Sequence, residues 1–514
     1  MTDEDAPPRY RFGPLERRGL VAGWRGGQIA VVASGLVVAV GILRARPSPA
    51  GVAVAFVAVV AGVAAATWPF AGRTAEEWAP DAARHIDALR RQRKMRRRAP
   101  FATLRLIDID LARTATAVPV PLRRSAHQKG RSDDGPNAGV IHDVAAQTFT
   151  AVLSVSGPGF VLLGASDKTR RIDGWSGVLA SLAREGTAVH RVQWIERSLP
   201  DDGAEVRHHV TERTVVDVES TPYRSYVDLV EGEVAAVHRH EVMLAVTVHA
   251  GRSARAVRGA GGGQRGACAV LLRETASLAR RLGEAGLDVA GVLAPGALAD
   301  AVRRGFDADT PRSERYNGQA SGTAHPPAAH PPTAHPRPGR HQMTWPGPMA
   351  IFSEWGRVRT DATWHTTYWI AEWPRTDVAA DFLGPLLLVS DVRRSVAVTM
   401  EPVAPLRAAR RIEQARTADI ADAELRRRAG FLATMRRRRE EDVLVQREGE
   451  LADGHASFRF SGYVTVSALD IDELEEACGR MEQVAGQAGL ELRRCYGDQA
   501  VAFTCTLPFG RGLA

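Results

Sequence analysis

Two long apolar runs near the amino terminus constrain this chain more than any other feature. They read "IAVVASGLVVAVGIL", residues 29–43, and "GVAVAFVAVVAGVAAATWPF", residues 51–70, and neither contains a charge. A helix of about 20 apolar residues is long enough to cross the hydrocarbon layer of a membrane. We therefore predict a transmembrane hairpin with helices at about 26–43 and 50–70. A buried hairpin of a soluble protein is the alternative for runs so rich in Ala, Gly and Val.

The charges around the two runs predict their orientation. Residues 1–98 hold 16 Lys and Arg against 8 Asp and Glu, whereas the rest of the chain holds 51 of each. The basic residues lie before the first run and after the second, where "RRQRKMRRR" spans Arg90–Arg98. Positive residues remain on the cytoplasmic side of a membrane. We expect both termini and the main body in the cytoplasm, with anionic lipid attracted to Arg90–Arg98. Signal-peptidase cleavage at "SPAG", residues 48–51, is the rival interpretation, but the second apolar run follows at once.

The remainder of the chain mixes helix and strand patterns. Residues 458–466 alternate apolar and polar side chains, as a half-buried strand requires. Acidic residues at 470–476 then favour the start of a helix, and two further strand-like stretches follow. We predict an α+β fold, in which cytoplasmic mixed α/β domains have ferredoxin-like (split βαβ) character.

A proline- and histidine-rich stretch divides the body. The imperfect repeat "TAHPPAAHPPTAHP" places His325, His330 and His335 at equal spacing, which could bind a soft divalent metal but is more typical of a low-complexity linker. We therefore divide the chain into four segments. They are 1–98, the membrane hairpin with a basic juxtamembrane helix; 99–307, a first cytoplasmic α+β domain; 308–345, the linker; and 346–514, a second α+β domain with a long charged helical region.

The stretch "GAGGGQRGAC", residues 259–268, is the strongest candidate for a nucleotide-binding loop. Gly261 and Gly266 have the glycine spacing of G-x-x-x-x-G-K-[ST]. Ala267 and Cys268, however, occupy the positions of the lysine that meets the phosphates and of the hydroxyl that holds magnesium. The sequence therefore favours a plain turn into a helix.

Other short motifs also fail to indicate an enzyme or a metal site. "HHVTE", residues 208–212, lacks two histidines spaced as in a metalloprotease helix, and there is no G-x-S-x-G elbow. The four cysteines form no C-x-x-C pair, which favours free thiols in a reducing compartment. We predict that the chain is not an enzyme and has no catalytic, cofactor-binding or metal-binding residues.

Two surface features remain for interaction with partners. Arginines cluster at 426–428 and 436–439 within a charged helical region, as a solvated helix face or a partner-docking face. Five aromatic residues crowd into nineteen positions, and we expect most of them in the core and part of them at an interface. They are Trp355, Trp364, Tyr368, Trp369 and Trp373.

Longer stretches of the sequence resemble those of known proteins. "YRFGPLERRGLVAGWRGGQ" before the first apolar run, with "RTAEEWAP" after the second, resembles actinobacterial two-helix integral membrane proteins of conjugation-like type IV secretion clusters. "YWIAEWPRTDV", "RSVAVTMEPV" and "LPFGRGL" resemble the region that precedes the motor in conjugative type IV secretion ATPases. In those ATPases a nucleotide-binding domain follows; this sequence stops at Ala514, and we therefore expect the motor on a separate chain.

The resemblance implies a non-catalytic inner-membrane scaffold of a type IV secretion or conjugation-like apparatus. Such a scaffold would dock a separately encoded secretion ATPase and other membrane secretion subunits, and would form a homo-oligomer. No direct nucleic-acid binding is expected. The E-type membrane component of a type VII secretion system, which also joins two membrane helices to a cytoplasmic α/β domain, is the first alternative. A membrane-tethered degenerate ATPase is the second.

Overall fold

The computed structural model describes most of the membrane hairpin and of the body. The described residues are 26–45, 47–68, 101–111, 122–123, 137–157, 160–200, 220–234, 238–307, 345–389, 391–428 and 435–513, with isolated positions within 10–12, 74–86 and 210–217. The predicted linker, apart from Trp345, and the predicted lipid-attracting run Arg90–Arg98 lie outside them.

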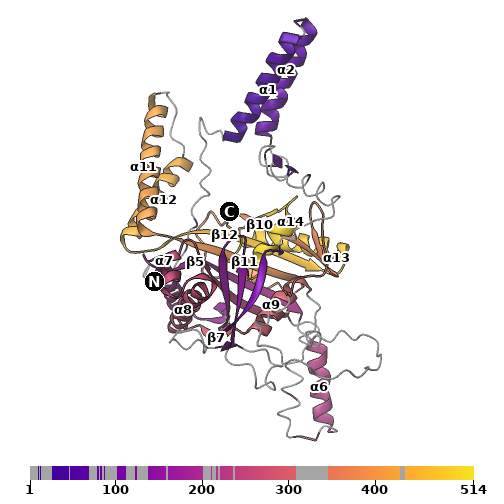
Figure 1. Ribbon diagram of the computed structural model, residues 1–514. Helices are drawn as coiled ribbons and strands as arrows, with labels where there is room; N and C mark the ends of the chain where they lie inside the picture. The colour runs from indigo at the N-terminus through magenta and orange to yellow at the C-terminus, as the bar shows by residue number, and fades with distance from the viewer. Residues whose placement is uncertain are drawn as a thin grey trace, which may run out of the picture.

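Helices α1 (Gly26–Ala45) and α2 (Pro49–Thr67) form an antiparallel hairpin that stands apart from the sheet (Figure 1). Their mean hydropathy of 2.0 and 2.3 and their length suit membrane spans, and little of either is buried. A Cβ built on Gly35 would lie 3.4 Å from the Cα of Gly62, so small residues bring the two backbones into close contact. The predicted pair of apolar helices is confirmed, with bounds within a few residues.

The body is built on one large sheet. Among the described residues, its main strand order is β1-β3-β4-β6-β5-β11-β12-β10-β9-β8, with β7 beside β4, β13 beside β10, and β2 parallel to β7. The strands are β1 Leu104–Asp110, β2 Leu122–Arg123, β3 Asn137–Asp143, β4 Thr148–Ser156, β5 Val189–Pro200, β6 His238–His249, β7 Asp288–Leu293, β8 Ile351–Ser353, β9 Val358–Thr360, β10 Thr363–Glu372, β11 Arg393–Val403, β12 Ser457–Ala468 and β13 Glu491–Arg494.

Helices connect these strands. They are η3 Phe160–Leu162, α4 Ala165–Leu182, α6 Thr221–Val234, α7 Ala254–Gly259, α8 Gly263–Glu284, α9 Pro295–Phe306, α10 Gly384–Leu387, α11 Pro405–Arg428, α12 Met435–Ala452, α13 Ile471–Gln487, α14 Gln499–Phe503 and η4 Thr504–Thr506. The predicted mixture of helices and strands behind a membrane hairpin is therefore confirmed.

The junction between β5 and β11 joins the two halves of the body. These strands pair antiparallel from Arg394 opposite Ser198 to Met400 opposite Val192. Segments 99–307 and 346–514 thus contribute to a single sheet, and their division into two domains stays a prediction.

The same topology occurs on both sides of this junction. In the first half, the elements β4, α4, β5, β6, α8 and β7 follow one another, and their strands lie in the order β7-β4-β6-β5. In the second half, β10, α10, β11, β12, α13 and β13 give the order β13-β10-β12-β11. In both halves the first strand therefore lies between the fourth and the third. The second strand lies next to the third, at the junction. Each half also has a helical insertion between its second and third strands, α6 in one and α11–α12 in the other.

Both faces of the sheet are covered, one by helices and the other by a helix together with the carboxyl-terminal residues. On one face α8 packs on Leu153 and Leu244, and α13 packs on Val464 through Leu474 and Met481. On the other face lie α9 and residues 499–513, whose core includes Phe306, Phe503, Leu507 and Phe509. His365 lies there against the Phe503 ring, and burial lowers its pKa to about 3.

Residues 505–511 form hydrogen bonds and an ion pair with strands β3, β5 and β11 on this second face. The side-chain amide of Gln193 on β5 donates to the Cys505 carbonyl oxygen at 2.6 Å, and its oxygen accepts from the Gly510 N–H at 2.9 Å. The Arg511 guanidinium binds Asp143 on β3 at 2.6 Å, while Thr399 on β11 donates to the Arg511 carbonyl oxygen. The phrase "LPFGRGL" is therefore part of the fold's internal packing.

Candidate functional site

Residues ahead of the membrane hairpin contact the second half of the sheet. Tyr10 and Val378 exchange two backbone hydrogen bonds with N–O distances of 2.9 and 3.0 Å. The Phe12 ring stacks on Trp373 at a centroid distance of 5.2 Å, and it lies 5.3 Å from the Phe382 ring. The chain before α1 is thus held on the body by backbone pairing and by aromatic packing.

A residue that follows the membrane hairpin contacts the same half. The Trp78 ring stacks on Trp355 at 5.9 Å and lies 5.6 Å from Tyr496. Trp355 and Tyr496 are brought together because the Gly497 N–H donates to the Trp355 carbonyl oxygen at 2.7 Å. We call the contacts of Tyr10, Phe12 and Trp78 with the body the flank contacts. They place residues on both sides of the α1–α2 hairpin in the sequence at the same half of the sheet.

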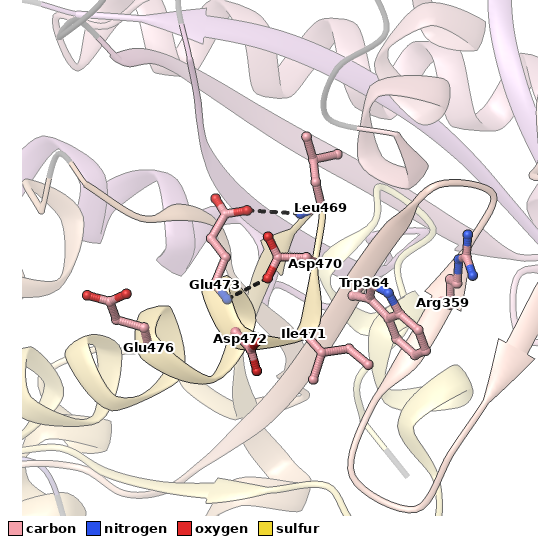
Figure 2. Close-up of a pocket in the computed structure, with 8 residues that line it drawn as sticks. All are labelled: Arg359, Trp364, Leu469, Asp470, Ile471, Asp472, Glu473 and Glu476. Atoms are coloured by element: carbon pink, nitrogen blue, oxygen red, sulfur yellow. Dashed lines mark hydrogen bonds between the residues drawn. The ribbon is translucent and has the colours of Figure 1, made fainter.

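A groove lies beside the flank contacts, and a pocket lies at the start of α13. The groove has a volume of about 660 Å³ and is lined by Trp373, Val378 and Phe382, together with residues at the end of α13. The pocket, of about 620 Å³, lies between Arg359, Trp364 and the start of α13 (Figure 2).

Two acidic side chains of that pocket accept hydrogen bonds from backbone N–H groups at the start of α13. The Asp470 carboxylate accepts from the Glu473 N–H at 2.8 Å, and the Glu473 carboxylate accepts from the Leu469 N–H at 3.2 Å (Figure 2). Asp470 is thus the N-cap of α13, and Glu473 satisfies a further backbone donor just before it. The predicted start of a helix at these acidic residues is therefore confirmed, while Asp472 and Glu476 remain exposed on the first turns.

Of the five clustered aromatic residues, three pack within the body and two receive the flank contacts. Tyr368 is buried and donates to Glu482 at 2.8 Å, and the indole N–H of Trp369 donates to Ser461 at 3.2 Å. Trp364 lies under the guanidinium groups of Arg357 and Arg359, each 5.5 Å from a ring centroid. The remaining two, Trp355 and Trp373, receive the flank contacts.

The glycine-rich stretch 259–268 spans the end of α7, the turn that follows it and the first residues of α8. Gly261, Gly262 and Gly263 all have positive φ angles, of 99°, 72° and 56°, a region that only glycine adopts readily. Ala267 and Cys268 are buried at 0% and 1% exposure. A side chain at either position faces the core instead of the hollow of about 1190 Å³ outside the turn, which Arg252, Arg255, Arg265 and Arg273 help to line.

Gly266 is required by packing, and this gives a testable prediction. A Cβ at this position would lie 2.4 Å from the Val257 carbonyl oxygen, a backbone atom that cannot turn aside. We expect Gly266→Ala to separate α7 from α8 and to lower the free energy of unfolding by about 1–3 kcal/mol, measured by chemical denaturation. Gly259→Ala is the matched control, because its Cβ meets nothing within 4 Å. Equal stability of the two variants would contradict this packing role.

A buried ionic cluster lies where β5 and β6 approach α9 and β11. Arg197 and Arg394 are each 1% exposed. Arg197 donates to the Ala301 carbonyl oxygen at 2.8 Å, and Arg394 lies 3.7 Å from Glu196. Burial lowers the pKa of Arg197 to about 10, so its guanidinium stays charged at neutral pH. Sequence patterns gave no signal for this cluster, since single arginines within strands are typical of solvent-facing positions.

Several sequence candidates are placed only in part. His325, His330 and His335 and nearly all of 208–212 lie outside the described residues. Cys268, Cys478 and Cys505 are buried free thiols, and Cys495 is a partly buried one. Within the described ranges, no three His, Cys, Asp or Glu side chains are grouped as a metal site would need.

The fold and the flank contacts define a class: an α/β body attached at one half of its sheet to a hairpin of two apolar helices. Comparison with known families adds a more particular likeness. A family model described as "Putative type VII ESX secretion system translocon, EccE" matches residues 236–370. This range runs from β6 through most of β10 and so includes the α7–α8 turn, α9 and Trp355. No curated protein matches the chain.

This match and the two apolar helices indicate a membrane component of a secretion system. The match gives no support to the resemblance to type IV secretion clusters or to the pre-motor region of their ATPases. It favours the alternative from the sequence, an E-type component of type VII secretion.

Proposed function

We propose that this chain is the E-type membrane component of a type VII secretion translocon and acts as a non-catalytic scaffold. The observation that carries the proposal is the family match over residues 236–370. The α1–α2 hairpin ahead of the sheet is consistent with it. The buried positions of Ala267 and Cys268 support a scaffold rather than a nucleotide-using enzyme.

The proposed orientation has both termini and the body in the cytoplasm. The flank contacts support it because Tyr10 precedes α1 and Trp78 follows α2, yet both residues lie against the same body. The excess of arginines outside the two spans supports the cytoplasm as the side on which that body lies.

We also infer that each half of the sheet is a ferredoxin-like, split βαβ unit. The repeated order of fourth, first, third and second strand supports this assignment. Two such units joined edge to edge through β5 and β11 provide a broad, rigid platform. Its partners in this proposal are other membrane subunits of the translocon, a separately encoded secretion ATPase and further copies of the chain.

Deletion of the gene in its native host tests the function. Secretion of the substrates of a type VII cluster is expected to fall to background and to return when the full chain is restored. The tagged chain, solubilised in mild detergent, should copurify with type VII membrane subunits. Normal type VII secretion in the deletion strain, or copurification with type IV subunits instead, would overturn the proposal.

The flank contacts give a separate structural prediction. In Phe12→Ala with Trp78→Ala, loss of four aromatic contacts, each worth about 0.5–1.5 kcal/mol, should release both flanks from the body. Because the Val378 N–H donates to Tyr10, its hydrogen exchange is expected to speed up about tenfold. Tyr226→Ala on α6, where the side chain is exposed, is the control and should leave Val378 unchanged. Unchanged exchange in the double variant would mean that the aromatic rings do not hold the flanks.

A further inference from the structure

A hollow lined by arginines lies between α7, the first half of α8 and the residues that lead into β5. It is the hollow of about 1190 Å³ outside the glycine turn, and we call it the basic hollow. Its lining consists of arginines together with Gly, Ala, Ser and Thr residues. The arginines are Arg252, Arg255, Arg265 and Arg273. Among the described residues, no acidic, aromatic or large apolar side chain lines this space.

The fold fixes the positions of these arginines. Arg265 and Arg273 are separated by eight residues on α8, with Ala269 midway between them, so all three lie on one face of the helix. Arg255 belongs to α7. The Gly262 N–H donates to the Val257 carbonyl oxygen at 2.8 Å, which holds α7 against the start of α8. Two packed helices therefore present guanidinium groups to the same hollow.

Two of the four arginines are partly neutralised by acidic side chains. Arg252 pairs with Glu401 at 2.8 Å, although the same carboxylate also pairs with Arg191 at 3.2 Å. Arg273 lies 3.5 Å from Glu274 on its own helix. These acids are committed to arginines that they already contact, and they offset at most two of the charges around the hollow.

The other two arginines have no partner within the described part of the chain. Arg255 and Arg265 are both exposed, and neither side chain forms an ion pair or a hydrogen bond there. Glu185, which precedes the lining residue Gly186, is exposed and lies beyond ion-pair distance of both. The first turn of α8 contains no acid and Gly262 provides no side-chain cap, so the positive end of the helix dipole adds to their charge. The hollow thus has an uncompensated positive potential.

We propose that the basic hollow docks an acidic segment of a partner polypeptide. Guanidinium groups form strong, often bidentate pairs with carboxylates, so Arg255 and Arg265 suit the Asp and Glu side chains of such a segment. Small-molecule pockets are usually about 300–1000 Å³ and are lined by large apolar and aromatic side chains, whereas this hollow is larger and its described lining has neither. Single-stranded nucleic acid is bound by aromatic rings on which the bases stack, and the described lining offers none.

The position of the hollow leaves the flank contacts undisturbed. In Figure 1, α7 and α8 lie at the end of the body opposite α13. The residues of the body that take part in the flank contacts all belong to the second half, and none of them lines the hollow. A partner could therefore bind α7 and α8 while the membrane hairpin stays attached. The choice of a protein as the occupant rests on the proposed scaffold function, to which the hollow adds a binding surface and the chemistry of the partner.

Hydrogen exchange of the full chain in detergent tests this docking, with octaglutamate as the probe and octalysine as the matched peptide. Amides of residues 254–266 are expected to exchange about tenfold more slowly with saturating octaglutamate, and high salt should remove the protection, because exposed charges are screened. Octalysine should have no effect. In Arg255→Gln with Arg265→Gln, the octaglutamate concentration that gives half of the protection should rise about tenfold, because two exposed ion pairs are lost.

A second pair of substitutions separates docking from a general effect of charge. Arg280→Gln with Arg281→Gln removes two charges at the other end of α8, about 22 Å from Arg265, and should leave the octaglutamate titration unchanged. Amides of β4 and β6 report the fold of every variant. If the variant at 255 and 265 unfolds, the comparison of the two peptides on the unaltered chain decides.

Three results would overturn the docking. They are an unchanged titration in Arg255→Gln with Arg265→Gln, protection by octalysine as strong as that by octaglutamate, and protection by octathymidylate at a lower concentration than by octaglutamate. The last result would favour a nucleic-acid partner. Each is measured on the purified chain, so failure here leaves the secretion defect expected of the deletion strain as a separate result.

Discussion

Replacing Phe503 by alanine is expected to lower the free energy of unfolding of the body by about 3–5 kcal/mol. Phe503 is 2% exposed, and its ring lies 4.4 Å from that of His365 and 5.7 Å from that of Phe306. It therefore fills the space between α9, β10 and the carboxyl-terminal residues. An alanine there would leave a cavity that three separate elements must collapse to fill.

Urea denaturation of the detergent-solubilised chain, followed by tryptophan fluorescence, measures this loss. Val501→Ala on the same short helix is the control, since Val501 is 49% exposed and should change stability by less than about 0.5 kcal/mol. A Phe503 variant as stable as the Val501 variant would show that the carboxyl-terminal residues do not complete the core.

Replacing Arg394 by methionine is expected to cost about 3–5 kcal/mol, because one member of a buried ion pair is removed. Glu196, whose side chain is only 5% exposed, would lose its charged partner on β11. The carbonyl oxygens of Leu387 and Val389, which accept hydrogen bonds from the Arg394 guanidinium, would lose their donor as well.

A double-mutant cycle identifies the cause of this loss. In Arg394→Met the buried Glu196 carboxylate keeps only the His240 imidazole, 2.6 Å away. Adding Glu196→Gln removes this poorly compensated charge and should restore part of the stability. Arg480→Met is the control, because the Arg480–Asp391 pair is exposed and worth at most about 1 kcal/mol. If the double variant lost as much unfolding free energy as the two single variants added together, or more, the charge explanation would be wrong.

Local patterns in the sequence were enough to predict the parts that depend on neighbours along the chain. Apolar length predicted α1 and α2, alternation predicted β12, and the acids at 470–473 predicted the start of α13. The chemistry missing at Ala267 and Cys268 also agrees with their buried positions. Each of these inferences needs only residues that lie within one turn, one strand or one span.

The pairings between distant residues could not be predicted in this way. Nothing in the composition of β5 or β11 specifies that they pair, because period-two alternation sets the face of a residue and not the partner of a strand. Neither Phe12 nor Trp78 belongs to a periodic pattern, and their contacts with Trp373 and Trp355 link residues hundreds of positions apart. The repeated strand order likewise becomes visible only from the pairings.

The hydrogen bonds of Gln193 impose an order of events during synthesis. Its two partners, Cys505 and Gly510, are translated 312 and 317 residues after it. While a ribosome is still making the second half, α1 and α2 are already available for insertion. One face of the first half then has α9 but still lacks residues 499–513. Such long-range closure is slow compared with local folding. Nascent chains therefore present an unfinished apolar face, and a chaperone that shields this face until translation ends would raise the yield of native protein.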